Sequence, residues 1–254
     1  MEYINKYFFK DMNVMFKRSM RHIFRSIDTI ITVSIIPIAI MLLFVYVFGG
    51  AIETGAEKYI DYLLPGIMLM TIGSGIAYVS YRLFTDKERG IFQRFHSMPI
   101  SRSTVLWGHV LTSLISNAIS VIVIILVALI MGFRSSAGIL EWLAVFGILG
   151  VFTLALTWVA VIAGLAAKTS DGAGAFSYPI IFLPFISSAF VPTHTMPSIV
   201  RAFAENQPVT PIVEAIRNLL ASQSVGNDIW VAIAWCTAII VVAYIFAMRI
   251  YKKL

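Results

Sequence analysis

The sequence predicts an all-α polytopic membrane protein with six transmembrane helices. Hydrophobic residues make up 59% of its 254 residues and charged residues only 13%, a composition outside the range of soluble domains. Its apolar stretches approach the length of about 20 residues that a helix needs to cross a bilayer. Because these stretches are continuous, they favour helices over a closed barrel, the other structure that satisfies its backbone in lipid.

Six spans are expected along the chain, at residues 29–49, 63–84, 105–131, 142–167, 176–191 and 229–248. The third and fourth are longer than a bilayer requires, so we expect them to tilt or to emerge from the membrane. The fifth is short and contains Pro179 and Pro184, so we expect it to bend.

The basic residues predict the orientation. Most of the nineteen lysines and arginines precede the first span, join the second span to the third, or follow the sixth. Because cytoplasmic loops retain Lys and Arg, both termini are predicted to be cytoplasmic, in a cell membrane. The net charge of +6 reflects this asymmetry and needs no nucleic-acid partner.

Two further segments have helical patterns. Residues 4–28 place apolar side chains at spacings of three and four with Lys and Arg between them, which predicts an interfacial helix against membrane lipids. A plain membrane anchor is at least as good a reading of this helix as a partner-binding role. Residues 198–221 predict two external helices that are too short to span and that enter the outer leaflet only where protein or water covers them. The whole chain, 1–254, is expected to be one domain.

Searches for catalytic chemistry mostly fail. Ala167 stands where a phosphate-binding loop requires Gly before Lys, so we expect no ATP site on this chain. The four histidines are scattered and the single cysteine excludes a cysteine-based metal cluster, so we expect no metal or other cofactor. Asn117, Ser113, Ser116 and Ser120 form a polar stripe on the third span, which we interpret as interhelical hydrogen bonding. No span holds a central acidic residue, so transport would need an outside energy source.

The connection "TDKERGIFQRFHSMPISRS", residues 85–103, carries many charges between two apolar spans. Thr85 or Asp86 could cap a short helix that ends before Pro99, here assigned to residues 86–98. Such a helix would offer charged and aromatic side chains to a soluble partner. An ordinary solvated loop is the alternative.

Two motifs resemble a known family, the type-2 ATP-binding-cassette exporter permeases, and in particular the bacterial daunorubicin-resistance-like membrane subunits. "ERGIFQRFHSMPISRSTVLWGHVL" is similar to the family's cytoplasmic signature of Glu, a basic residue and Gly before a helix and a P-x-S-R element. The second stretch carries Phe-x-Pro, Met-Pro, Asn-x-Pro-x-Thr and Ala-x-Arg. These positions are Phe190, Pro192, Met196, Pro197, Asn206, Pro208, Thr210, Ala215 and Arg217.

The resemblance implies that two permease copies form a dimer on two separate ATPase subunits, which would hold ATP and Mg²⁺. A homodimer is the simpler expectation, and a heterodimer stays open. Residues 86–98 would be the coupling helix that enters a cleft on the ATPase. Its coupling residues would be Glu88, Arg89, Gly90, Phe92 and Arg94, where complementary charge gives register and specificity.

The resemblance also implies that spans two and five line a pathway at the dimer centre and that the external helices close its outer end. Candidate pathway residues, for each of which a packing role is an equally good reading, are Tyr62, Met68, Met70, Tyr78, Phe176, Tyr178, Phe182 and Phe185. Candidate external-gate residues are Pro192, Pro197, Asn206, Pro208 and Arg217.

Methionine and flat aromatic side chains adapt to varied apolar ligands, so export of a hydrophobic drug, antibiotic, peptide or lipid-like substrate is favoured. Export of a lipid-linked glycan or polysaccharide is the first alternative. A membrane enzyme or scaffold is an alternative of another class.

Overall fold

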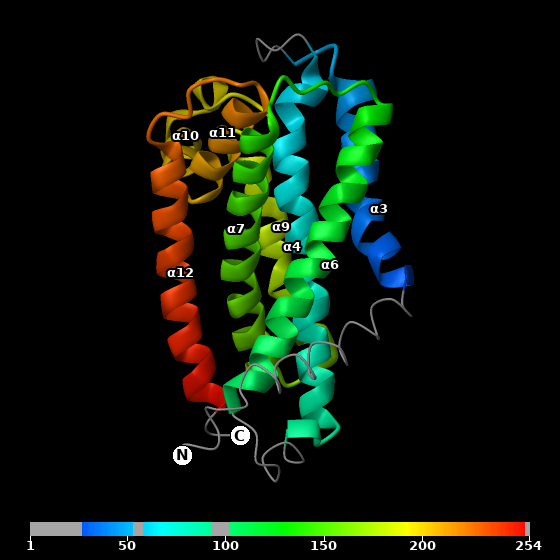
Figure 1. The fold of residues 1–254 in the computed structure, drawn as a ribbon, viewed down its shortest axis with the longest axis vertical. Coiled ribbons are helices and arrows are strands. Elements are labelled where there is room, and N and C mark those ends of the chain that lie inside the picture. The colour runs from blue at the N-terminus through cyan, green and yellow to red at the C-terminus, as the bar shows by residue number, and fades with distance from the viewer. Residues whose placement is uncertain (1–26, 53–57, 93–101, 252–254) are drawn as a thin grey trace.

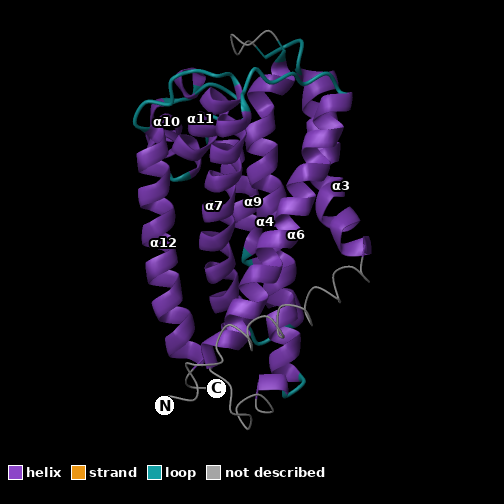
Figure 2. Cartoon of the chain, viewed as in Figure 1, coloured by secondary structure: helices purple, strands orange, loops and turns teal. Residues whose placement is uncertain are grey.

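A computed structural model describes residues 27–52, 58–92 and 102–251, and every regular element in these ranges is a helix (Figures 1 and 2). Five helical segments are long and apolar enough to cross a membrane. They are α3 (Ile27–Leu43) with its continuation η1 (Phe44–Phe48), α4 (Tyr59–Glu88), α6 (Arg102–Ile130), α7 (Ile139–Ala166) and α12 (Asp228–Tyr251). These confirm helices at five of the six predicted spans. The predicted interfacial helix at 4–28 lies almost entirely outside the described residues.

The long helices run side by side as a bundle, with α4 at its centre (Figure 1). Of the most apolar 18-residue window in each helix, 78% is buried in α4, against 17% in α3 with η1 and 22% in α12. The helix α4 packs against α3, α6, α7 and the short helices of the fifth segment. A central helix in this position has contacts through which a movement at its end can reach most of the bundle.

Small residues allow α4 to approach its neighbours closely. A Cβ atom on Gly164 of α7 would lie 2.6 Å from the carbonyl oxygen of Ser80 on α4. A Cβ atom on Gly66 of α4 would lie 2.6 Å from the Cβ atom of Ala189. Membrane helices use small residues in this way because close backbone approach increases van der Waals contact.

The fifth predicted span, 176–191, is not one continuous helix. It contains α9 (Ser177–Phe182) and η2 (Leu183–Ile186), preceded by α8 (Ser170–Ala175), and the chain turns to extended backbone at Ser187. The predicted bend is therefore confirmed, but a sixth helix of spanning length is not found in the described residues. The physical reason is that Pro179 and Pro184 lack the N–H group that a helix needs and are tolerated only near helix starts.

Two short helices lie at one end of the bundle, as residues 198–221 predicted: α10 (Ser198–Asn206) and α11 (Val209–Leu220), preceded by η3 (Thr193–Thr195). Figure 1 shows them beside the start of α12, at the end of the bundle opposite the C-terminus of α4, which Gly90 follows. The helix α11 buries Ile212, Val213 and Ile216 and packs against α12, α7 and α4. We call this the α11 end of the bundle and the opposite one the Gly90 end.

Candidate functional site

The structure changes the helix boundary predicted at the Gly90 end. The hydroxyl of Thr85 donates to the carbonyl of Tyr81 at 2.9 Å, and α4 continues through Glu88. A helix start at Thr85 or Asp86 is therefore wrong, because these residues belong to the last turns of α4. The chain reverses at Gly90, whose φ of +66° is the left-handed conformation common just after a helix end. Helical backbone resumes at Ile91 and Phe92.

Lys87, Asp86 and Phe92 attach this reversal to α7, α6 and α12 respectively. Lys87 Nζ donates to the carbonyls of Leu165 at 3.0 Å and Ala167 at 2.8 Å, at the C-terminus of α7. A lysine there satisfies carbonyls that lack helical partners and complements the negative end of the helix dipole. Asp86 Oδ2 lies 3.4 Å from His109 Nε2 on α6.

The third contact is made by Phe92, which is 1% exposed. Its ring meets that of Tyr251 on α12 edge to face, with centroids 5.4 Å apart. Glu88 and Arg89 stand between these attachments and are exposed. The turn therefore presents two opposite charges on a base that contacts α6, α7 and α12.

The five predicted coupling residues thus divide into different kinds. Glu88 and Arg89 are available to a partner, Gly90 provides the reversal, and Phe92 is an internal anchor of this chain. Arg94 lies outside the described residues. Sequence reasoning missed the anchoring role of Lys87, although a lysine at the end of a span is a recognisable signal for a helix C-terminus nearby.

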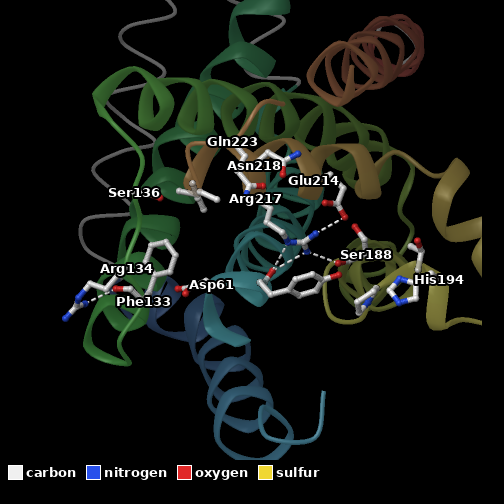
Figure 3. Close-up of a pocket in the computed structure, with 15 residues that line it drawn as sticks. Asp61, Phe133, Arg134, Ser136, Ser188, His194, Glu214, Arg217, Asn218 and Gln223 are labelled. Atoms are coloured by element: carbon white, nitrogen blue, oxygen red, sulfur yellow. Dashed lines mark hydrogen bonds and ion pairs between the residues drawn. The ribbon is translucent and has the colours of Figure 1, made fainter. Parts of the chain in front are cut away.

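The α11 end contains an open polar cavity of about 620 Å³, within the usual size range of ligand sites (Figure 3). It is lined by charged and polar groups that include Asp61, Arg134, His194, Glu214 and Arg217. The charges are of both signs. The cavity therefore suits a dipolar or hydrated occupant better than an apolar one.

Arg217 is the centre of the contacts around this cavity. Its guanidinium donates to Glu214 Oε1 at 2.7 Å, to the carbonyl of Ser188 at 2.7 Å and to the carbonyl of Tyr62 at 3.2 Å. The guanidinium carbon also lies 3.6 Å from the centroid of the Tyr62 ring, a cation–π arrangement. One side chain therefore joins α11 to α4 and to the chain that follows η2.

The other predicted external-gate residues do not all lie at this cavity. Pro192 lines the cavity, whereas Pro197 and Pro208 directly precede α10 and α11. Asn206 ends α10 and donates from its side chain to the carbonyl of Ala202 at 2.8 Å. Only Pro192 and Arg217 of this set meet at the cavity.

An exposed ion pair lies on the surface of α10. Arg201 Nε donates to Glu205 Oε1 at 2.7 Å, and the hydroxyl of Thr193 donates to the same oxygen at 3.2 Å. The hydrogen bond from Arg201 lowers the pKa of the Glu205 carboxyl. The carboxylate that joins η3 to α10 therefore stays charged to a lower pH than an isolated glutamate.

The predicted pathway residues do not form one wall within a single chain. Met68 and Met70 are at most 1% exposed and belong to the core. Tyr62 lies under Arg217, and Tyr78, Phe176 and Phe185 are half-buried. Tyr178 and Phe182 are exposed one turn apart on α9.

Aromatic rings also gather where α9 and η2 meet η1. Phe185 and Phe190 stack with centroids 4.3 Å apart, and Phe44 of η1 lies 4.9 Å from Phe190. Tyr59 at the start of α4 donates its hydroxyl to the Phe190 carbonyl at 2.7 Å. Phe182, whose ring centroid lies 6.0 Å from that of Phe185, therefore connects the exposed face of α9 to this aromatic cluster.

Comparison with known proteins decides the family. Residues 10–221 match the ABC-2 type transporter family. The chain belongs to this family. It is 25% identical over 225 residues to the daunorubicin resistance ABC transporter permease protein DrrB1 of Streptomyces coeruleorubidus, covering 88% of this chain and 80% of that one.

Two further relatives show the same level of similarity. The probable doxorubicin resistance ABC transporter permease protein DrrC of Mycobacterium tuberculosis is 25% identical over 217 residues, which covers 82% of this chain and 78% of that one. The putative transport permease ycf38 of Cyanophora paradoxa is 25% identical over 224 residues, with 86% and 77% covered. The chain is therefore a multi-pass ABC-2 permease, homologous to drug-resistance permeases, and such a permease works with an ATPase subunit.

Proposed function

We propose that this chain is the membrane subunit of an ATP-driven exporter that moves hydrophobic, drug-like or lipid-like compounds out of the cell. The observation that carries the proposal is the Gly90 reversal, where exposed Glu88 and Arg89 stand on contacts to three other helices. The names of two relatives, which refer to daunorubicin and doxorubicin resistance, support the drug class.

In this proposal the ATPase supplies the energy and this chain supplies the path. ATP and Mg²⁺ are held by the ATPase, of which two copies serve a homodimer of the permease in the membrane. Closure of the ATPase displaces the Glu88–Arg89 turn. Because Lys87, Asp86 and Phe92 attach that turn to α7, α6 and α12, the displacement changes the packing around α4.

The proposed orientation places the Gly90 end in the cytoplasm and the α11 end outside, in the cell membrane. The exposed aromatic pair Tyr178 and Phe182 is the part of α9 available to line a pathway between two copies. The polar cavity around Arg217 then lies at the exit. Its mixed charges favour water over an apolar compound, which assists release.

The test is doxorubicin export into inside-out membrane vesicles. The double variant Glu88→Arg with Arg89→Glu should lose most ATP-dependent uptake while its membrane insertion is unchanged, because complementary charge at an interface gives specificity. Arg201→Glu is the control, since it changes an exposed charge at the other end. If the double variant takes up as much doxorubicin as Arg201→Glu does, a membrane enzyme or scaffold is indicated instead.

A further inference from the structure

A second polar site lies inside the bundle and extends toward the Gly90 end. A crevice between α3, α4 and α6 is lined by Val33, by Gly75, Tyr78 and Arg82, and by the polar face of α6 that contains His109 and Asn117. We call it the inner crevice. Polar groups at this depth are costly unless they have partners, so each of them requires an explanation.

Three of the four hydroxyl groups with which α6 lines the crevice are explained by contacts within the chain. Thr112 donates to the carbonyl of Gly108 at 2.6 Å and Ser116 to that of Thr112 at 2.9 Å. Ser113 and Thr157 of α7 share a hydrogen bond of 2.9 Å. These groups stabilise the packing of α6 and need no ligand.

Asn117 is different. It is 2% exposed, and its Nδ2 donates to the carbonyl of Ser113 at 2.9 Å and to the Ser113 hydroxyl oxygen at 3.2 Å. Exchanging the amide oxygen and nitrogen would set oxygen against the Ser113 carbonyl, so the hydrogen bonds fix the orientation. Its Oδ1 is left as a buried acceptor without a hydrogen-bond partner among the described residues. Leaving such an acceptor unsatisfied costs about 1–3 kcal/mol.

Gly75 makes room for this acceptor. A Cβ atom at position 75 would lie 2.1 Å from Asn117 Oδ1, far inside van der Waals contact. Any larger residue would push the amide away from its place on the crevice wall. Gly75 and Asn117 therefore form one feature, in which a bare backbone faces a carbonyl oxygen.

The size of the inner crevice limits what it can bind. Its volume is about 40 Å³, enough for one hydroxyl or ammonium group but far below the hundreds of Å³ of a drug-sized site. The rest of a bound molecule would lie outside the crevice. There α3, which places Val33 at the crevice, exposes Ile36 three residues further on, on the same side of the helix, and this suits an apolar body in lipid.

From these observations we propose that the inner crevice binds the hydrogen-bond-donating group of an amphiphile, a hydroxyl or an ammonium, at Asn117 Oδ1. The apolar part of the amphiphile stays in the lipid beside α3. This inference rests on the proposed function where the amphiphile is the transported compound, and a membrane lipid is the other source of the same chemistry. Because His109 lines the crevice and also contacts Asp86, occupancy can affect the Gly90 end.

The test measures doxorubicin binding by fluorescence, with the full chain in phosphatidylethanolamine–phosphatidylglycerol nanodiscs. Doxorubicin is an amphiphile with hydroxyl and amine groups. Asn117→Leu keeps the volume and removes the acceptor, and we expect about five- to tenfold weaker binding from the loss of one buried hydrogen bond. Ser74→Ala is the matched control, since its hydroxyl donates to the Met70 carbonyl and does not line the crevice.

A second variant tests the same acceptor if Asn117→Leu does not fold. Gly75→Ala leaves Asn117 in place but displaces its oxygen, so it should weaken doxorubicin binding in the same direction. Retention of the monodisperse elution profile shows that each variant is folded. Native mass spectrometry of the same samples identifies any lipid that co-purifies.

The outcomes separate the two sources. Weaker doxorubicin binding in Asn117→Leu and Gly75→Ala supports the site with the transported compound as its ligand. Unchanged doxorubicin binding, with one lipid retained by wild type and Ser74→Ala but lost from Asn117→Leu, supports the site with a lipid. If neither ligand responds to Asn117→Leu, or wild type binds neither, the inference is overturned, whereas vesicle export tests the proposed function separately.

Discussion

Replacing Arg217 with Met should weaken the attachment of α11 to α4 and so lower the free energy of unfolding. The guanidinium bonds to Glu214 and to two carbonyls, and it stacks on the Tyr62 ring. Hydrogen bonds to a charged group contribute about 1.5–3 kcal/mol each and a cation–π contact about 1 kcal/mol. These terms are not additive and the side chain is 14% exposed, so we expect a total loss of about 3–5 kcal/mol, the range for breaking a buried pair.

The assay is thermal unfolding in nanodiscs, followed by the loss of the monodisperse elution peak. At about 2–4 °C per kcal/mol for a chain of this size, Arg217→Met should lower Tm by about 10 °C. Arg217→Lys keeps the charge but not the planar fork, so it should recover less than half of the loss. Arg134→Met is the control, because Arg134 is exposed and, among the residues that the structure describes, donates to the nearby carbonyls of Leu129 and Phe133. Equal Tm values for Arg217→Met and Arg134→Met would refute the reasoning.

Three other predictions follow from the packing and the topology. Lys87→Met should reduce ATP-dependent export several-fold while ATP hydrolysis continues, because the turn loses its attachment to α7; unchanged export would count against that role. Gly164→Val introduces a clash with α4 that costs about 2 kcal/mol, so it should lower Tm by about 4–8 °C; Gly147→Val, whose added side chain meets open space, should leave Tm unchanged, and equal Tm values for the two variants would contradict the close contact. Cysteines at Ser222 and Ser97 should react with impermeant maleimide from outside and inside respectively, and the reverse pattern would overturn the orientation.

The long helices could be predicted because lipid imposes a continuous apolar run of known length on each of them. The end of α4 was harder to place. Asp86, Lys87 and Glu88 have the composition of a loop, but they are the last turn of a helix that extends past the apolar run. Charge marks the membrane boundary and not the helix boundary, so the predicted cap at Thr85 was wrong.

The fifth segment shows a second limit. Pro179 and Pro184 predicted a bend, and the structure has two short helices, α9 and η2, instead of one. The sequence could not show whether α9 and η2 would remain one helix, because neighbouring helices decide how the freed backbone groups are satisfied.

The candidate site was recovered only in part. Arg217 was identified through family resemblance, but its bond to the Tyr62 carbonyl joins residues 155 positions apart, which no local pattern reveals. Met68 and Met70 were candidate pathway residues by type. Because α4 is surrounded by neighbours, both are buried in the core, and a nearly uniformly apolar helix gives no signal for which face is covered.

Purification of the full chain by affinity from native membranes, followed by ATPase assay of the proteins that co-purify, tests the central claim most directly. The account predicts a stoichiometric ATP-hydrolysing subunit with wild type, and its loss with the Glu88→Arg, Arg89→Glu double variant but not with Arg201→Glu. Recovery of the ATPase in equal amount with the double variant, or purification of wild type without any ATPase, would contradict the assignment of the Gly90 reversal as the coupling site.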